Sequence, residues 1–160
     1  MEPLEFSPVC EQSLPQRWLV PSQRKHLRLP DYDYHQPGVY FITVGAYGRT
    51  CLFGSVTAGQ VLLNNAGRVV ESCWREIPRH FGHATLDQYI VMPNHIHGLL
   101  ILQGSDATVG SIVAGFKSAA SRRIHALNGT SGIPVWQRGY YEHVVRSDQA
   151  LARIREYVVN

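Results

Sequence analysis

The spacing of apolar and polar positions along the first half of the chain predicts a strand, a hairpin and a helix. The segment Val39–Tyr47 is rich in β-branched and aromatic residues, which favours a strand. A small hairpin is expected about Ala58 and Gly59. Over Asn64–Ile77 the apolar residues recur at helical spacing, and Pro78 should end that helix.

The second half of the chain shows the same two periodicities. Two strands are predicted over Ala84–Pro93 and His95–Leu102, with a tight turn between them. The remaining elements are a helix over Val109–Leu127 with a Ser111 cap, a short strand over Tyr141–Val145, and a final helix capped by Ser147 or Asp148.

The order of these elements predicts the fold class. Apart from the hairpin and the last helix, the order is strand, helix, strand, strand, helix, strand. That is the split βαβ order of an α+β ferredoxin-like (RRM-like) sandwich, to which the final helix is an addition that should pack beside the sheet. Residues 1–37 contain six of the nine prolines and little periodicity. We therefore expect an ordered but irregular N-terminal arm over residues 1–37, with a disordered tail as the alternative, and one folded domain over residues 38–160.

The length, hydropathy and cysteine content of the chain indicate the class of protein and the compartment to expect. At 160 residues the chain is long enough to bury a substantial core in one domain. No apolar run reaches the length of a membrane span, and the first residues lack the apolar segment of a secretory signal. The three cysteines, Cys10, Cys51 and Cys73, are scattered and form no Cys-x-x-Cys pair. This pattern favours the reducing cytoplasm and argues against a thiolate zinc site.

The charge of the chain favours a phosphate-bearing partner. The formal net charge is +3, and 13 of the 15 basic residues are arginine. A guanidinium group binds phosphate oxygens in a fork and stacks on bases, and Tyr32, Tyr34 and Tyr140 could stack on unpaired bases. A genome with a high GC content would also raise the arginine count, so composition alone leaves both interpretations open.

Two histidines interrupt an otherwise apolar strand. Residues two apart in a strand point to the same face, so His95 and His97 should project together, with Cα atoms about 6 to 7 Å apart. That spacing would let two ring nitrogens meet at one cation, although a hydrogen-bonded structural pair is the alternative. We expect both imidazoles to stand on the sheet surface, so that replacing either with alanine should leave the fold intact.

The segment "MPNHIHGLL" around these histidines resembles the HUH (histidine–hydrophobic–histidine) signature of the single-tyrosine transposases. Together with "LRLPDYDYHQPGVYFITV", "GFKSAASRRI", "VWQRGYYEHVVR" and "ALARIREYVVN", it resembles the REP-associated tyrosine transposases of bacteria. The family has a ferredoxin-like or RRM-like sheet. The resemblance implies metal-dependent cleavage and rejoining of single-stranded DNA beside hairpin-forming repeats, through a covalent phosphotyrosine.

The resemblance also implies roles for individual residues. His95 and His97 match the metal ligands of the family, for Mg²⁺ or Mn²⁺, and Tyr157 matches its nucleophile. The third ligand of the family lies four positions after the tyrosine, one position beyond Asn160, so Asn160 is expected to substitute for it. We expect weak activity from the chain as given, and more when Asn or Gln follows Asn160. Whether the tyrosine acts within one chain or across a homodimer stays open.

Several basic residues are candidates for DNA contacts, although each could also be an ordinary solvated charge. They are Arg24, Lys25 and Arg28 in the arm, Lys117, Arg122 and Arg123 on the predicted helix, and Arg138 before Tyr140. Arg153 or Arg155 could help to stabilise the phenolate of Tyr157. By sequence alone, Tyr140 and Tyr141 compete with Tyr157 as nucleophiles.

Two other classes of protein fit parts of the sequence. One is a non-catalytic RRM-like nucleic-acid-binding module in which the histidines are structural, and its DNA binding would not respond to a chelator. The other is a small hydrolase whose metal activates water, and it would form no covalent protein–DNA species.

Overall fold

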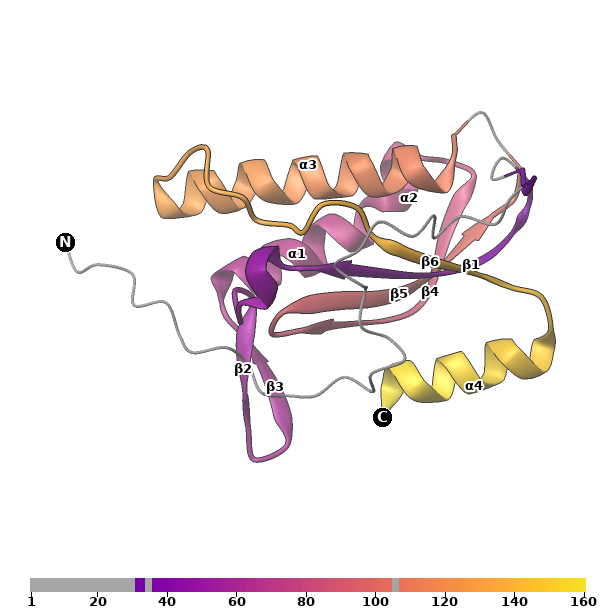
Figure 1. The fold of residues 1–160 in the computed structure, drawn as a ribbon, viewed down its shortest axis with the longest axis horizontal. Helices are drawn as coiled ribbons and strands as arrows, with labels where there is room; N and C mark the ends of the chain where they lie inside the picture. Colours follow the sequence, from indigo (N-terminus) through magenta and orange to yellow (C-terminus); the bar gives the residue numbers. More distant parts are fainter. Residues whose placement is uncertain (1–30, 34–35, 105–106) are drawn as a thin grey trace.

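The computed structural model describes residues 31–33, 36–104 and 107–160 (Figure 1). Most of the predicted N-terminal arm, including Arg24, Lys25 and Arg28, lies outside the described residues. The elements in chain order are β1 (Gly38–Gly45), the 3₁₀ turn η2 (Tyr47–Arg49), β2 (Gly54–Thr57), β3 (Gln60–Leu63), α1 (Asn65–Arg75), α2 (Ile77–His80), β4 (Ala84–Met92), β5 (His95–Leu102), α3 (Val109–Asn128), β6 (Tyr141–Val145) and α4 (Asp148–Val159).

Four strands form the central sheet, in the order β4-β5-β1-β6. All of its neighbouring strands run antiparallel. Strand β5 lies between β1 and β4, the two strands that α1 and α2 connect, and this insertion is the split βαβ arrangement. The predicted α+β class is therefore confirmed, as is the final helix packed on the sheet.

The predicted elements differ from the structure mainly at their ends. Pro78 does not end the helical path. It lies in the first turn of α2, where backbone N–H groups have no hydrogen-bond partner within the helix, so a residue that lacks the N–H is tolerated. The cap of α3 is Thr108 rather than Ser111, because the Thr108 hydroxyl accepts a hydrogen bond from the Ser111 N–H at 3.1 Å. Ser147 caps α4 in the same way, through the Ala150 N–H at 3.1 Å.

The predicted hairpin is also confirmed. Strands β2 and β3 are joined by Ala58 and Gly59, whose φ angles are 51° and 77°. Two consecutive positive φ angles form the tight turn that matches the twist of paired strands. The hairpin projects from the domain on the same side of the sheet as α4 (Figure 1).

The two faces of the sheet are covered differently (Figure 1). Helices α1 and α3 pack on one face over a large apolar core to which β5 contributes Ile96 and Leu100. Helix α4 lies on the other face, where Val158 packs on Leu99 and Phe41. No helix among the described residues is long and apolar enough to cross a membrane.

Gly98 in β5 belongs to the larger core. A Cβ atom built at this position would lie 2.3 Å from Cζ2 of Trp74, which α1 places against the strand. The indole ring therefore occupies the space that a side chain at position 98 would need. Helix α1 can approach the sheet closely only because this residue is glycine.

Candidate functional site

The two histidines of β5 point toward α4. Their side chains alternate with Ile96, which packs on the opposite face, and only 5% of His95 and 3% of His97 is exposed. The ring of Phe41 stacks on His97 at a centroid distance of 5.3 Å, and the ring of Tyr157 meets it edge-on at 5.6 Å. The prediction that the imidazoles stand on an open sheet surface is therefore wrong, because α4 and its aromatic ring cover them.

A chain of hydrogen bonds fixes the two rings. Nδ1 of His95 lies 2.6 Å from Asn94 Oδ1, and Nδ1 of His97 lies 2.8 Å from the Thr43 hydroxyl. The two Nε2 atoms face each other at 2.9 Å. Since the Asn94 oxygen can only accept, His95 donates from Nδ1, His97 donates from Nε2 to His95, and Thr43 donates to His97. Each neutral ring thus has a partner at both nitrogens.

The paired Nε2 atoms fit a shared divalent ion. Burial lowers the pKa of His95 to about 4 and that of His97 to about 3, so both rings are neutral, the ligand form, at pH 7. Two ligands about 2.1 Å from one ion, at a right angle, would lie about 3 Å apart. To free its Nε2 for such an ion, His97 would carry its proton on Nδ1 instead and donate it to the Thr43 hydroxyl, which can also accept a hydrogen bond. These outer hydrogen bonds are the kind that orient metal-binding histidines.

The described residues contain no cluster of three or more His, Cys, Asp or Glu side chains that could hold a metal ion. The histidine pair would therefore need further ligands of another kind, such as an amide oxygen, water or a phosphate oxygen. Asn160 borders the same groove as the two histidines. Its side-chain nitrogen donates to the Glu156 carbonyl at 3.1 Å, which leaves the amide oxygen as the atom that could serve.

Tyr157 stands at the edge of this site. Helix α4 places its ring against His97 and, at 6.5 Å, edge-on to Phe41. The side chain is 37% exposed, so one part of it packs and another part is open to solvent. Burial raises the pKa of the phenol, which makes deprotonation harder.

Arg155, one of the two arginines considered as partners of the phenolate, contacts a carboxylate instead. Its Nε donates to Asp87 Oδ2 at 2.8 Å, and its Nη2 forms an ion pair with the same oxygen at 2.6 Å. Arg153 is exposed on the same helix. Neither arginine is a cause of the shift in the pKa of Tyr157.

A groove of about 750 Å³ gives access to the histidines and the tyrosine. One wall is the β2–β3 hairpin with Val56 and Gln60, and another is the end of α4 with Val159 and Asn160. Its remaining lining comes from β4, β5 and α1, and includes Glu71. The groove is therefore lined mostly by apolar side chains and has the polar atoms of the histidine pair in its wall.

The competing tyrosines separate by face. Tyr140 packs on the α1 and α3 side, where its hydroxyl donates to Glu142 at 3.0 Å. Tyr141 packs on the α4 side, next to the cluster that contains Phe41. Of the described tyrosines, only Tyr157 and Tyr89 line the groove, and Tyr89 comes from β4.

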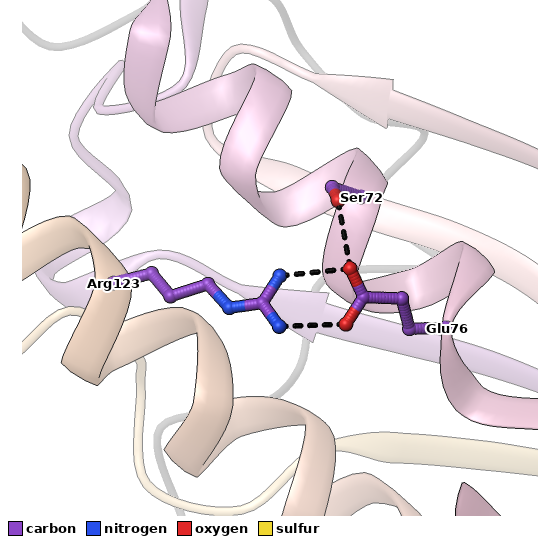
Figure 2. Close-up of polar contacts among 3 residues, drawn as sticks. All are labelled: Ser72, Glu76 and Arg123. Carbon is purple, nitrogen blue, oxygen red and sulfur yellow. Dashed lines mark hydrogen bonds and ion pairs between the residues drawn. The ribbon is translucent and has the colours of Figure 1, made fainter. Parts of the chain in front are cut away.

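The predicted DNA contacts on α3 lie across the sheet from the histidines. Lys117 is half-buried and donates to the carbonyls of Gln137 and Gly139 at 2.8 and 3.0 Å. Arg123 binds both carboxylate oxygens of Glu76 on α1, at 2.9 and 2.6 Å, as Figure 2 shows. Both side chains therefore hold neighbouring segments together.

Arg122 and Arg138 are exposed. The structure brings together the predicted His95, His97, Tyr157 and Asn160, and it does not bring Lys117, Arg122 or Arg123 to that site. A DNA molecule that contacts both regions would have to pass around an edge of the sheet. The roles of these basic residues in DNA binding stay predictions.

Sequence reasoning missed the residues that support the site. Asn94 could have been found, since it precedes His95 directly. Thr43 was hidden because it reaches His97 only through the pairing of β1 with β5, where the two residues are directly opposite. Asp87 was hidden for a similar reason, because its partner Arg155 is 68 positions away.

Comparison with known proteins gives consistent results. Residues 55–160 match the family described as Transposase IS200 like. An uncharacterized protein of Haemophilus influenzae is 34% identical over 158 residues, which cover 86% of this chain and 87% of that protein. A protein of the same organism named as a putative REP-associated tyrosine transposase is 26% identical over 136 residues, covering 79% of this chain and 70% of its own length.

Two solved structures share the fold. One is described as a REP-associated tyrosine transposase bound to a REP hairpin; it has a TM-score of 0.59 and 18% identity, covering 82% of this chain and 70% of that one. The other is a putative transposase of Deinococcus radiodurans, with a TM-score of 0.51 and 20% identity, covering 83% of this chain and 95% of that one. At these identities the likeness concerns the fold alone.

Proposed function

The chain belongs to the IS200-like transposase family of DNA-cleaving and DNA-transferring enzymes, and on that premise we propose that it cleaves and rejoins single-stranded DNA through a covalent link to Tyr157. The observation that carries this proposal is the position of Tyr157, whose ring lies against His97 beside a pair of facing Nε2 atoms. A nucleophile and a metal-binding pair are the two parts that the reaction needs.

The cofactor we propose is Mg²⁺ or Mn²⁺. His95 and His97 would hold it through Nε2, with the Asn160 amide oxygen, water or a phosphate oxygen as further ligands. When bound, such an ion polarises a non-bridging phosphate oxygen. The support for this cofactor is the donor geometry of the two neutral rings, whose outer nitrogens are already held by Asn94 and Thr43.

The reaction step belongs to Tyr157. Its oxygen forms a bond to phosphorus while the bond from phosphorus to the 3′ oxygen breaks, so the phenolic proton is lost and the leaving oxygen gains one. Attack by a 3′-OH reverses the step and rejoins the strand, with no need for ATP. Removing a proton from a phenol of pKa near 10 at pH 7 costs about 4 kcal/mol, and burial adds to that cost. The contacts of Arg155 direct it to Asp87, so the bound cation is the better candidate for offsetting the cost.

The substrate we propose is a hairpin with a single-stranded flank. The histidine pair is buried and is reached through a groove between the β2–β3 hairpin and α4. An unpaired strand can turn one phosphate into such a groove, whereas a duplexed phosphate must first be released from its helix. The solved relative described as bound to a REP hairpin is consistent with this substrate.

The test is the formation of a protein–DNA adduct that survives denaturation. A labelled hairpin oligonucleotide with a single-stranded flank is incubated with Mn²⁺ and analysed on a denaturing gel. Wild type should form the adduct, and a chelator should prevent it. Tyr157→Phe should form none but should still bind DNA, because only the oxygen is lost.

Tyr141→Phe is the matched control, since it removes the same atom from the same face of the sheet. It should form the adduct at the wild-type rate. An adduct that persists in Tyr157→Phe would mean that another residue is the nucleophile. Cleavage without an adduct would favour the metal-dependent hydrolase, and chelator-insensitive binding without cleavage would favour the RRM-like module.

A further inference from the structure

Strand β4 contains a β-bulge at Asp87–Gln88. The pairing of β4 with β5 shifts between Leu86 and Tyr89, so two residues stand opposite the single residue Leu99. Leu86 and Tyr89 both pack on the core beneath α1 and α3, although a regular strand would point residues three apart to opposite faces. The bulge thus places an extra residue opposite Leu99, whose side chain belongs to the α4 face.

Asp87 uses both carboxylate oxygens in this arrangement. Oδ1 accepts a hydrogen bond from the Gln88 N–H of the bulge at 2.8 Å, which fixes the carboxylate on β4. Oδ2 takes Nε and Nη2 of Arg155 from α4, at 2.8 and 2.6 Å. The side chain of Asp87 is 14% exposed and that of Arg155 is 48% exposed, so the carboxylate is largely shielded from water while the guanidinium is partly solvated.

The apolar attachment of α4 is slight by comparison. Val158 is the only fully buried residue of this helix, while Leu151 and Ile154 are half-buried. These side chains and the ring of Tyr157 are the apolar contacts that hold the helix, so the ion pair with Asp87 is a further restraint on its rotation. Because a tyrosine oxygen lies about 6 Å or more from the axis, a rotation of about 10° moves it by about 1 Å. A displacement of that size can slow a reaction about 100-fold.

We propose that Asp87 and Arg155 are positioning residues: their ion pair ties α4 to the bulge of β4, limits rotation of the helix about its axis, and thereby keeps the ring of Tyr157 against His97. The proposal rests on the proposed function of Tyr157 as the nucleophile. It assigns a role in the reaction to two residues that act through the placement of Tyr157.

The experiment compares Arg155→Gln, Asp87→Asn and the double variant with Arg146→Gln. Arg146 is an exposed arginine just before α4, so its loss changes the net charge equally without touching the bulge. The rate of adduct formation is measured in a single turnover at saturating DNA and Mn²⁺, which separates positioning from binding. Hydrogen exchange of the α4 amides is measured in the same proteins without DNA.

We expect Arg155→Gln and Asp87→Asn each to slow adduct formation by about 10- to 100-fold and to speed exchange in α4. The double variant should be no slower than the worse single variant, since both remove one interaction. Arg155→Lys should recover part of the rate, and Arg146→Gln should match wild type. DNA affinity should agree within about twofold between Arg155→Gln and Arg146→Gln.

Two results would overturn the proposal separately from the proposed function. Wild-type adduct rates in Arg155→Gln and Asp87→Asn would show that the pair does not position the tyrosine. If the fold-decreases in adduct rate of the two single variants multiply in the double variant, each residue acts alone. A wild-type protein that forms no Tyr157-dependent adduct would instead overturn the proposed function and this role with it.

Discussion

The two faces of the sheet are built from the same strands but serve different purposes, a stabilising core on one face and the candidate site on the other. Under α1 and α3, alternate residues of β1 and β5 enter a large core with aromatic side chains such as Trp74 and Phe116. Under α4, the intervening residues Phe41 and Leu99 form a small apolar cluster with Val158 of the helix, beside the two buried histidines. The first face supplies most of the apolar burial that stabilises the fold. The α4 face can therefore contain buried polar groups and a groove while the domain stays folded.

The largest expected effect comes from removing a histidine on the α4 face. His97→Ala should abolish metal-dependent adduct formation and weaken Mn²⁺ binding. Because the ring is buried, its loss should also lower the stability by about 1 to 3 kcal/mol, since Nε2 of His95 and the Thr43 hydroxyl lose their hydrogen bonds to it. Calorimetric titration with Mn²⁺ and thermal melting test both parts. Equal metal affinity in mutant and wild type would refute the assignment of the metal site.

The next effect compares apolar side chains on the two faces. Phe116→Ala should lower the free energy of unfolding by about 3 to 5 kcal/mol, since the ring is buried against Trp74 and Trp136. Ile154→Ala on α4 should cost less, about 1 to 2 kcal/mol, because that side chain is only half-buried. Urea denaturation measures both. The ranking should reverse for the adduct rate of the folded protein, where Ile154→Ala is the slower variant.

A smaller effect concerns the ion pair between α1 and α3. The hydrogen bonds from Arg123 and then from Ser72, which Figure 2 draws, lower the pKa of Glu76 to about 2. A depressed carboxyl pKa stabilises the fold above the unfolded value near 4.5, and that contribution is lost as the pH falls toward 2. Wild type should therefore lose its melting-temperature advantage over Glu76→Gln across this interval. A difference in melting temperature between wild type and Glu76→Gln that stays constant from pH 6 to pH 2 would contradict this prediction.

The smallest expected effect tests whether DNA reaches the α3 face at all. If Arg122 contacts a phosphate, Arg122→Gln should weaken hairpin binding a few-fold and reduce the salt dependence of binding by about 0.9 in log–log slope. Arg138→Gln gives the same test for the loop before β6. Fluorescence anisotropy at several salt concentrations measures both. Unchanged slopes would confine the DNA to the α4 face.

Local patterns were sufficient to predict most of the fold. The alternation in β1 and β5, the Ala58–Gly59 turn and the helical spacing in α1 and α3 each depend on neighbours in the sequence, and the structure has these elements within a few residues of the predicted bounds. The family match likewise confirms the resemblance found in the motif around His95 and His97.

What local patterns could not predict was the packing of distant segments. Nothing near His97 indicates that α4 buries it, because the covering residues lie some sixty positions later in the chain. Arg123 looked like a DNA contact because its partner Glu76 lies on another helix. Arg155 looked like a partner of the phenolate because the bulge that turns Asp87 toward it is a property of strand pairing.

The glycine that follows the two histidines has a consequence for how such motifs evolve. In the sequence, His95, His97 and Gly98 look like one motif with one purpose, yet the space beside Gly98 is filled by Trp74, on the face of the sheet opposite the histidines. The motif therefore combines two separate structural requirements, the histidine pair on one face of the strand and close packing of Trp74 on the other. Relatives with a smaller residue in place of Trp74 should tolerate alanine in place of Gly98. Covariation between these two positions, independent of the histidines, would be the signature of these separate requirements.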